Sequence, residues 1–227
     1  MSIAFDLYGT LVDIRTDEES PRFRKKFTRF LKKSGRECEF FLRYREEIKK
    51  HEEEEIDLVL VFEAVLNCSA EEARNIMKAY RRFSRRKLRL YPHVRSMLTE
   101  LKRRGAKVYL ISNAQNAFTM DELVALKIKP FFDGIALSSD YAVKKPSAVF
   151  FQRAMDCFSV TANETVYVGN DVACDMIGSS SVGMRSVYIR TNISPQEDTV
   201  LRACEIAEYG TNRHKKLKAY LLKMLSV

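Results

Sequence analysis

Several short apolar segments of this chain are followed by polar side chains of types that act on anions. These side chains are Asp6, Ser112, Asn113, Asn170, Asp171 and Asp175, together with Lys145, which precedes a proline. A carboxylate is ionised at neutral pH and attacks without an activating base, while a lysine neutralises a substrate anion and the charge that builds in the transition state. Carboxylate and amide oxygens also suit a hard cation such as Mg²⁺. The residue types therefore predict covalent carboxylate catalysis on an anionic substrate, with or without a bound cation.

The segments that carry these residues have the pattern of strands in a parallel sheet. Apolar runs predict strands at 3–5, 107–112, 165–169 and 185–189, with a weaker run at 134–138. Helical patterns at 92–104 and 146–158 lie between them. Strands that alternate with helices predict an α/β fold with a doubly wound, mainly parallel sheet, whose ligands bind at the carboxyl ends of the strands. We therefore expect the polar side chains to converge.

A helical insertion interrupts this alternation. Residues 15–90 contain one glycine and one proline, and they carry amphipathic patterns at 22–33, 40–54, 56–67 and 70–87. We predict an all-helical domain over residues 15–90 and an α/β core domain formed by residues 1–14 and 91–227.

The composition is that of a globular chain with a basic surface. Of 227 residues, 46% are hydrophobic, and 39 Lys and Arg against 30 Asp and Glu give a net charge of +9. This excess favours anionic partners, but its basic runs are typical of solvated helix faces, so nucleic-acid binding is not the preferred interpretation. Five cysteines without metal spacing, and no stretch typical of a signal peptide or membrane span, predict a cytoplasmic protein with no membrane partner.

Four motifs resemble those of the haloacid dehalogenase superfamily. The segment FDLYGTLVD at residues 5–13 is similar to the first motif, LISN at 110–113 to the second, KP at 145–146 to the third, and VGNDVACD at 168–175 to the fourth. Their order and their places at predicted strand ends make the match specific. The resemblance covers residues 1–13 and about 91–190, and the helical insertion resembles the cap that many members carry after the first motif.

The resemblance implies a hydrolase that works through a covalent intermediate. It implies that Asp6 is the nucleophile and that water later hydrolyses the aspartyl intermediate. Lys145 would neutralise charge, Ser112 would supply a hydroxyl to a substrate oxygen, and Asn113 beside it is a further catalytic candidate. Asp175 would orient Lys145 or join a metal shell.

Two positions depart from the pattern of the family's phosphatases. Tyr8 stands where they carry a second aspartate as general acid and base, and the family's 2-haloacid dehalogenases share this tyrosine. A halide leaving group needs no proton, so Tyr8 favours a dehalogenase, unless it is an aromatic residue packed under the cap. Asn170 stands where many members have an acidic metal ligand, although Asp171 follows it. The resemblance implies a Mg²⁺ site formed by Asp6, the main-chain carbonyl of Tyr8, and Asn170 or Asp171.

The function expected from these motifs is a Mg²⁺-dependent phosphatase of small phosphorylated metabolites. A 2-haloacid dehalogenase and a catalytically weak binding protein are the alternatives. Thr10 and Arg43 are further candidates for substrate contacts. Arg43 lies where a dehalogenase cap delivers an arginine, although its basic surroundings are more typical of a solvent-facing helix residue. The motifs specify neither the substrate nor the oligomeric state.

Overall fold

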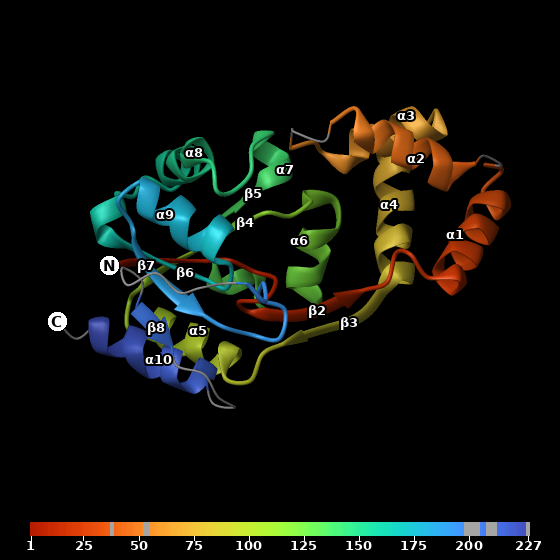
Figure 1. Cartoon of the computed structure of the whole chain (residues 1–227). Helices are drawn as coiled ribbons and strands as arrows, with labels where there is room; N and C mark the ends of the chain where they lie inside the picture. The colour runs from red at the N-terminus through yellow and green to blue at the C-terminus, as the bar shows by residue number, and fades with distance from the viewer. Residues whose placement is uncertain (37–38, 52–54, 198–204, 208–212, 226–227) are drawn as a thin grey trace.

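A six-stranded parallel sheet organises most of the chain (Figure 1). The computed structural model describes residues 1–36, 39–51, 55–197, 205–207 and 213–225. The strand order is β5-β4-β1-β6-β7-β8, and every neighbouring pair is parallel. The strands are β1 (Ser2–Phe5), β4 (Lys107–Ser112), β5 (Gly134–Leu137), β6 (Thr165–Gly169), β7 (Arg185–Ile189) and β8 (Glu205–Ala207). The predicted α/β fold with a doubly wound, mainly parallel sheet is therefore confirmed.

Helices cover both faces of this sheet. One face packs on α5 (Val94–Arg103), α6 (Asn116–Ala125) and α10 (Arg213–Met224), and the other on α8 (Ala148–Phe158). The shorter helical segments are η1 (Lys129–Phe131), α7 (Ser138–Tyr141), η2 (Ala162–Glu164), η3 (Val172–Ile177) and α9 (Gly178–Ser181). Within the described part of the chain, no helix combines the length and the apolar character needed to cross a membrane.

The alternation of side chains along each strand explains the two cores. Ile3 and Phe5 of β1 are fully buried in the cluster that contains α5 and α10, whereas Ala4 belongs to the cluster that contains α8. Val108 and Tyr109 of β4 divide between the two clusters in the same way. Because successive strand side chains point to opposite faces, a continuous apolar run fits a sheet covered on both sides.

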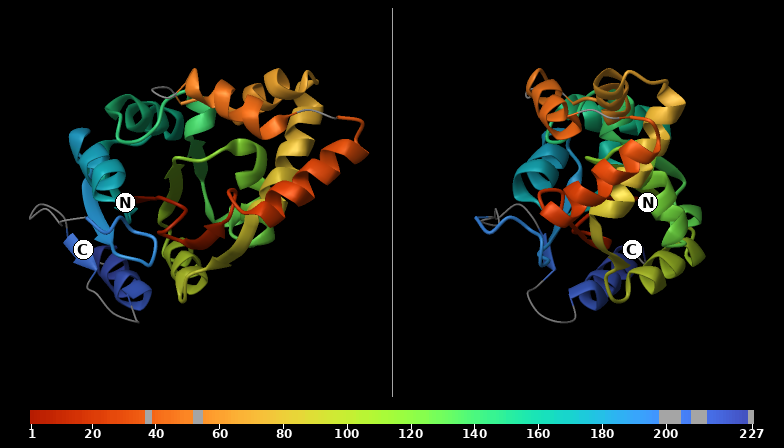
Figure 2. Two further views of the ribbon diagram at one scale, coloured as in Figure 1. Left: turned by 45° about the vertical axis from the view of Figure 1, so that its right-hand side comes forward. Right: turned by 90° about the vertical axis from the view of Figure 1, so that its right-hand side faces the viewer.

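Four helices form a second, smaller group with its own core (Figures 1 and 2). They are α1 (Pro21–Lys33), α2 (Phe40–Lys49), α3 (Leu58–Leu66) and α4 (Ala70–Ser84). Aromatic rings dominate their contact: Phe27 lies 5.0 Å from Phe40 and 5.1 Å from Tyr80 between ring centroids, both edge to face. Such pairs are stabilising beyond the area that they bury. We refer to these four helices as the cap.

Two strands that the sequence did not predict join the cap to the sheet. β2 (Val12–Thr16) and β3 (Arg85–Leu90) form an antiparallel pair, so the helix expected to continue to Lys87 ends at Ser84, and residues 15–90 are not wholly helical. The basic run of β3 resembles an exposed helix face in the sequence. β3 pairs instead with β2, which is distant in the sequence, and Lys87 and Arg89 form ion pairs with Asp13 of β2.

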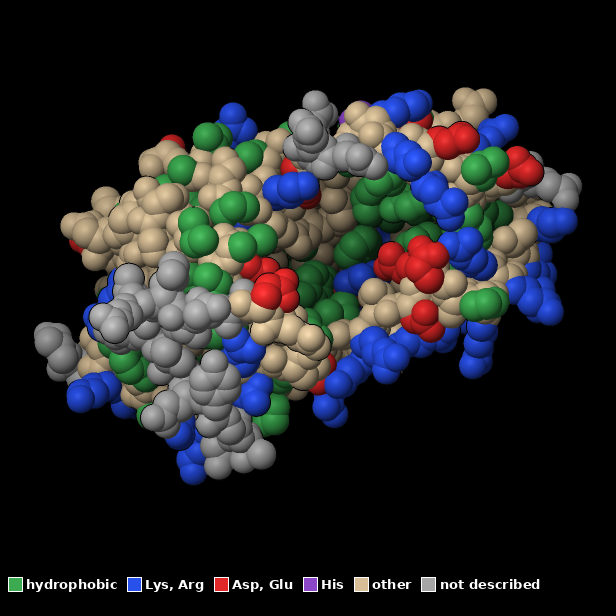
Figure 3. Space-filling model, viewed as in Figure 1, with side chains coloured by type: hydrophobic (Ala, Val, Ile, Leu, Met, Phe, Trp, Pro, Cys, Tyr) green, Lys and Arg blue, Asp and Glu red, His purple; other side chains and the backbone are tan. Residues whose placement is uncertain are grey.

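The cap also contacts the sheet part through polar side chains. Gln115 donates to the carbonyl of Ile56 at 2.9 Å and accepts from the amide of Leu58 at 2.8 Å. Ser138, at the end of β5, bonds to Glu55 at 2.6 Å. A hollow remains between the cap and the sheet part (Figure 3). These contacts hold the cap beside the ends of β4 and β5.

Candidate active site

Asp6 and Ser112 lie at the carboxyl ends of neighbouring strands. Asp6 follows β1, Ser112 is the last residue of β4, and the two strands pair in parallel. Both side chains are buried, and the Ser112 hydroxyl donates to Asp6 Oδ1 at 2.9 Å. The convergence expected from the strand pattern is therefore present for this pair.

Lys145 joins the two acidic residues of the site. Its Nζ lies 2.8 Å from Asp6 Oδ1 and 2.6 Å from Asp175 Oδ1, and the side chain is 3% exposed. Burial alone would lower the pKa of Lys145, but the charges of Asp175 and Asp6 outweigh it and raise that pKa well above its usual value. The lysine is therefore a fixed positive charge beside Asp6.

Asp175 uses both carboxylate oxygens to build this arrangement. Oδ1 accepts from Lys145, while Oδ2 accepts from the backbone amides of Asn170 and Asp171 at 2.9 and 3.1 Å. Gly169 permits this approach, since a Cβ at that position would lie 2.3 Å from the Asp175 carboxyl carbon. Asp175 therefore orients Lys145 and shapes the loop after β6, and it has no oxygen to spare for a metal.

Tyr167 belongs to the same cluster, although no motif in the sequence marks it. Its hydroxyl lies 3.0 Å from Lys145 Nζ, 3.0 Å from Asp175 Oδ1 and 3.0 Å from the carbonyl of Ile111. Burial and the charge of Asp175 raise the pKa of Tyr167 well above its usual value, so the phenol stays protonated. A tyrosine inside the apolar run TVYVG is the only signal that the sequence offered.

Asn113 positions Lys145 through its backbone. The Asn113 side chain donates to the carbonyl of Lys145 at 3.0 Å and accepts from its amide at 2.8 Å. This two-way contact fixes the segment that carries the lysine. Asn113 is therefore a positioning residue in this structure, rather than one directed at a substrate.

The loop after Asp6 is held by a buried contact between Thr10 and Asn170. The Thr10 hydroxyl is fully buried and donates to Asn170 Oδ1 at 3.0 Å, so it is not placed to contact a substrate as the sequence suggested. Gly9 has a φ of +91°, and a Cβ there would lie 2.5 Å from the Asn170 amide. Only glycine combines that backbone conformation with so close an approach.

Tyr8 points into the contact between the cap and the sheet part. Its hydroxyl donates to Glu122 Oε2 at 2.6 Å and lies 3.1 Å from Thr119 Oγ1, and it makes no hydrogen bond with Asp6 or Lys145. Burial and the charge of Glu122 raise the pKa of Tyr8 well above its usual value. This placement corresponds to the second interpretation of Tyr8, an aromatic residue packed under the cap.

Glu122 on α6 is the centre of that contact. The carboxylate is 2% exposed, and it accepts from Arg81 Nε at 2.9 Å and Arg85 Nη1 at 3.1 Å. Arg81 comes from α4 of the cap and Arg85 begins β3. Tyr8 is thus tied to the cap through the buried carboxylate of Glu122. No local sequence pattern signals this role of Glu122.

Opposing influences act on the protonation of Asp6. Burial raises the pKa of its carboxyl and the charge of Asp175 adds to this, and together they outweigh Lys145 and the Ser112 hydroxyl, which favour the ionised form, so the pKa of Asp6 lies above its usual value. The ion pair with Lys145 at 2.8 Å favours the carboxylate form of Asp6 against this shift. A buried, ionised carboxylate at a strand end is suited to nucleophilic attack.

The remaining oxygens near Asp6 fit a hard cation. Asp6 Oδ2 and Asp171 Oδ2 have no hydrogen-bond partner among the described residues, and the Asn170 amide oxygen accepts one hydrogen bond, from Thr10. No group of three or more His, Cys, Asp or Glu side chains suited to a metal occurs in the described part of the chain. Two carboxylates, an amide and water are nevertheless the donors that Mg²⁺ accepts, since it keeps several waters.

Arg43 is not brought to this cluster. It lies on the exposed side of α2, while the neighbouring Tyr44 packs among the aromatic rings of the cap. The structure therefore matches the second interpretation of Arg43, a solvent-facing helix residue.

Residues 3–189 match the family described as haloacid dehalogenase-like hydrolase. Because this match covers most of the chain and includes all four motifs, the chain belongs to this family of hydrolases, as the motifs predicted. A solved 2-haloacid dehalogenase from Pseudomonas syringae pv. Tomato DC3000 is similar over 98% of each chain, with a TM-score of 0.64 at 18% identity. This likeness shows a shared fold.

Curated relatives match over shorter segments. The chain is 36% identical over 102 residues to the glyceraldehyde 3-phosphate phosphatase of Methanocaldococcus jannaschii, covering 45% of each protein. It is 28% identical over 127 residues to the phosphoserine phosphatase of Thermus thermophilus, covering 56% of this chain and 51% of that protein. The chain thus spans about half the length of the curated relatives that it matches.

Proposed function

We propose that this hydrolase is a Mg²⁺-dependent phosphatase of small phosphorylated metabolites that forms an aspartyl phosphate at Asp6. The observation that carries the proposal is the buried contact of one lysine, Lys145, with both Asp6 and Asp175 at the strand ends. The two relatives, a glyceraldehyde 3-phosphate phosphatase and a phosphoserine phosphatase, support phosphate as the reacting group.

The chain's own residues account for the covalent steps. An Asp6 oxygen attacks phosphorus, the bond from phosphorus to the leaving oxygen breaks, and that oxygen departs with the electron pair. Ser112 and Lys145 hold Asp6 in place and lie beside the oxygens on which negative charge increases. Water then attacks phosphorus, and Asp6 is released with inorganic phosphate as the product.

The charge of the site supports the need for a cation. Lys145 is the one cation in contact with Asp6 among the described residues, and Asp175 shares it. Asp6, Asp171 and Asp175 together outweigh that single positive charge, so a phosphate dianion would meet net repulsion. Asp6, Asp171 or Asn170, and the main-chain carbonyl of Tyr8 would hold Mg²⁺, which supplies the neutralising charge.

The placement of Tyr8 bears on the choice of substrate. Its hydroxyl is bonded to Glu122 and therefore does not protonate a leaving group in this arrangement. Without a positioned acid, departure depends on how well the leaving group carries negative charge. We expect acyl and aryl phosphates to react faster than alkyl phosphates.

The domain division and the cellular setting are parts of the same proposal. Residues 15–90 act as a cap over a core formed by residues 1–14 and 91–227, which the separate aromatic core of the four helices supports. The described cysteines Cys68, Cys157 and Cys174 are free thiols, which supports a reducing compartment such as the cytoplasm. The partner that we propose is a small anionic substrate.

Phosphate release from a panel of acyl, aryl and alkyl phosphates, with and without Mg²⁺, tests the proposal. Asp6→Asn removes the nucleophile, and Asp156→Asn removes the same charge from an exposed position on α8 as a matched control. Activity that needs Mg²⁺ and Asp6 but not Asp156 supports the phosphatase. Absence of phosphate release from every compound by the folded wild-type protein contradicts it.

One observation favours a second candidate, a 2-haloacid dehalogenase. A halide leaves without a proton, so this reaction does not need the Tyr8 hydroxyl, which is bonded to Glu122. Halide release from 2-chloropropionate, dependent on Asp6 and indifferent to Mg²⁺, would favour this candidate. Absence of both reactions would favour a weakly active member that binds a ligand.

A further inference from the structure

The ammonium group of Lys145 is enclosed by three acceptors of the protein. A charged lysine carries three hydrogens on Nζ. Nζ lies 2.6 Å from Asp175 Oδ1, 2.8 Å from Asp6 Oδ1 and 3.0 Å from the Tyr167 hydroxyl oxygen. Because the side chain is buried, these contacts are made away from bulk water. Three acceptors therefore match the three hydrogens.

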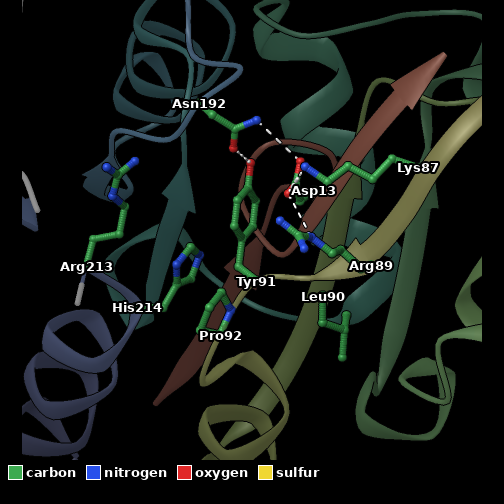
Figure 4. Close-up of a pocket in the computed structure, with 9 residues that line it drawn as sticks. All are labelled: Asp13, Lys87, Arg89, Leu90, Tyr91, Pro92, Asn192, Arg213 and His214. Carbon is green, nitrogen blue, oxygen red and sulfur yellow. Dashed lines mark hydrogen bonds and ion pairs between the residues drawn. The ribbon is translucent and has the colours of Figure 1, made fainter. Parts of the chain in front are cut away.

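A second lysine that pairs with a buried aspartate lacks this enclosure. Lys87 Nζ lies 2.5 Å from Asp13 Oδ2, and Figure 4 shows this contact beside a pocket that both residues line. The Lys87 side chain is 34% exposed, so water reaches its ammonium group. Among the residues that the structure describes, Lys145 is the one buried lysine. The enclosure thus distinguishes the site from an ordinary lysine–aspartate pair.

The fold brings the Tyr167 hydroxyl to Lys145 from within the sheet part. Tyr167 lies opposite Ala4 in the pairing of β6 with β1, and both side chains belong to the core that contains α8. The hydroxyl lies 3.0 Å from the carbonyl oxygen of Ile111 in β4, the strand on the far side of β1. The tyrosine therefore reaches across β1 where the small side chain of Ala4 leaves room. Phe151 of α8 packs edge to face on its ring, with centroids 5.2 Å apart.

The Tyr167 hydroxyl accepts from Lys145 without giving up its own hydrogen. A phenol has one hydrogen and two lone pairs. The hydrogen is directed to the carbonyl of Ile111 or to Asp175 Oδ1, both at 3.0 Å, so a lone pair remains for Lys145. Burial and the charge of Asp175 raise the pKa of Tyr167, so the phenol stays protonated. Lys145 thus has one neutral acceptor beside its two carboxylates.

We propose that Tyr167 is a positioning residue that holds the ammonium group of Lys145 in place while the charge on Asp6 changes. This role rests on the proposed phosphatase, whereas the contact between the two side chains does not. Asp6 Oδ1 accepts from Ser112 and Lys145, and Oδ2 has no hydrogen-bond partner among the described residues, so Oδ2 is the oxygen that attacks. An electron pair of Oδ2 forms the bond to phosphorus, and the leaving oxygen departs with the pair of the bond that breaks. Negative charge thereby passes from Asp6 to the phosphoryl group and the leaving oxygen.

This loss of charge changes what holds Lys145. Asp175 then remains as the carboxylate that attracts the ammonium group, at 2.6 Å. One contact alone would leave the group free to rotate about it. The Tyr167 hydroxyl supplies a second contact, and its neutral oxygen is the same before and after the attack. Two fixed hydrogens set the direction of the third, which passes from Asp6 Oδ1 to a phosphoryl oxygen.

Tyr167→Phe tests the proposal, because it removes the hydroxyl and keeps the ring. Hydrolysis of acetyl phosphate with Mg²⁺ is measured well below the Tm of each variant. We expect kcat to fall by at least about tenfold while KM stays within about threefold of the wild-type value, since the contact acts on the transition state rather than on binding. Tyr109→Phe is the matched control from the same core and should behave as wild type, because the Tyr109 hydroxyl has no hydrogen-bond partner among the described residues.

A second measurement needs no turnover and therefore separates the contact from the proposed activity. In protein labelled with ¹⁵N at the lysine Nζ atoms, NMR records how fast ammonium hydrogens exchange with water. We expect slow exchange for the buried Lys145 and fast exchange for Lys87. In Tyr167→Phe, the exchange at Lys145 should be at least about tenfold faster and its ¹⁵N shift should change, whereas Tyr109→Phe should leave both as in the wild type.

The outcomes distinguish this proposal from the proposed function. Unchanged kcat in folded Tyr167→Phe, or an equal loss in Tyr109→Phe, overturns the positioning role and leaves the phosphatase standing. Absence of a slowly exchanging lysine signal in the wild-type protein overturns it without any variant. If the wild-type protein released no phosphate, the proposed function would fail. Faster exchange in Tyr167→Phe would then still support the hold on Lys145, and unchanged exchange would overturn it.

Discussion

Replacing Tyr8 with phenylalanine separates a role in cap attachment from a role in proton transfer. The substitution removes the hydroxyl that donates to Glu122 at 2.6 Å and keeps the ring, over which the Arg81 guanidinium lies at 5.5 Å. Glu122 keeps its bonds to Arg81 and Arg85, so its buried charge stays paired. The loss is therefore one hydrogen bond to a charged acceptor, which corresponds to about 1.5–3 kcal/mol of unfolding free energy.

The assays measure stability and chemistry on the same protein. For a chain of this size, the lost free energy corresponds to a fall in Tm of roughly 3–12 °C. Hydrolysis of an alkyl phosphate, whose leaving oxygen needs a proton, should change by less than about threefold, whereas loss of a general acid costs about 10²–10⁴-fold. Tyr109→Phe is the matched control, since the Tyr109 hydroxyl has no hydrogen-bond partner among the described residues.

One result would refute this reasoning. If Tyr8→Phe lost a hundredfold or more in kcat while its Tm stayed at the wild-type value and Tyr109→Phe behaved as wild type, Tyr8 would be the proton donor. The bond to Glu122 would then describe a state of the cap that opens before the reaction.

Three further predictions follow from buried contacts of the site and its loop. Asp175→Asn leaves Lys145 without its second carboxylate. It should lower kcat, measured by phosphate release, by at least about a hundredfold, and the unfolding free energy, measured by urea unfolding, by about 3–5 kcal/mol. Gly9→Ala places a Cβ against Asn170 at a φ of +91° and should lower the unfolding free energy more than Gly35→Ala does. At Gly35 the φ is +70°, but a Cβ meets nothing within 4 Å. Equal losses in the two variants would contradict the close approach of Gly9 to Asn170. Because burial lowers the pKa of His214 to about 4 from 6.5, the unfolded chain binds the additional proton, so stability should fall by up to about 1.4 kcal/mol per pH unit as the pH drops from 6.5 to 4. His214→Gln should flatten this dependence in urea unfolding curves.

The strands and their terminal residues were predictable because the fold places chemistry at strand ends. The runs at 107–112, 165–169 and 185–189 are strands with those bounds, and a parallel sheet brings their carboxyl ends to one edge. The meeting of Asp6 with Ser112 follows from that geometry. The expectation needed only the apolar runs and the motifs that follow them.

The contacts between the cap and the sheet part could not be predicted in this way. Tyr8 and Glu122 are separated by 114 positions, and neither lies in a local pattern that signals a buried bond. The strands β2 and β3 pair residues that lie 69 to 78 positions apart, and the basic run of β3 also fits an exposed helix face. Tyr167 was missed because its hydroxyl finds its partners only when β4 and η3 are in place.

On the proposed mechanism, Asp6 becomes phosphorylated during turnover. A single-turnover reaction with acetyl phosphate and Mg²⁺, stopped with acid and analysed by peptide mass spectrometry, tests it directly. We predict a phosphoryl group on Asp6 that forms and decays at rates consistent with kcat, and its absence in Asp6→Asn. Phosphate release at the full rate with no phosphoryl group on Asp6, or with the group on another residue, would contradict the account.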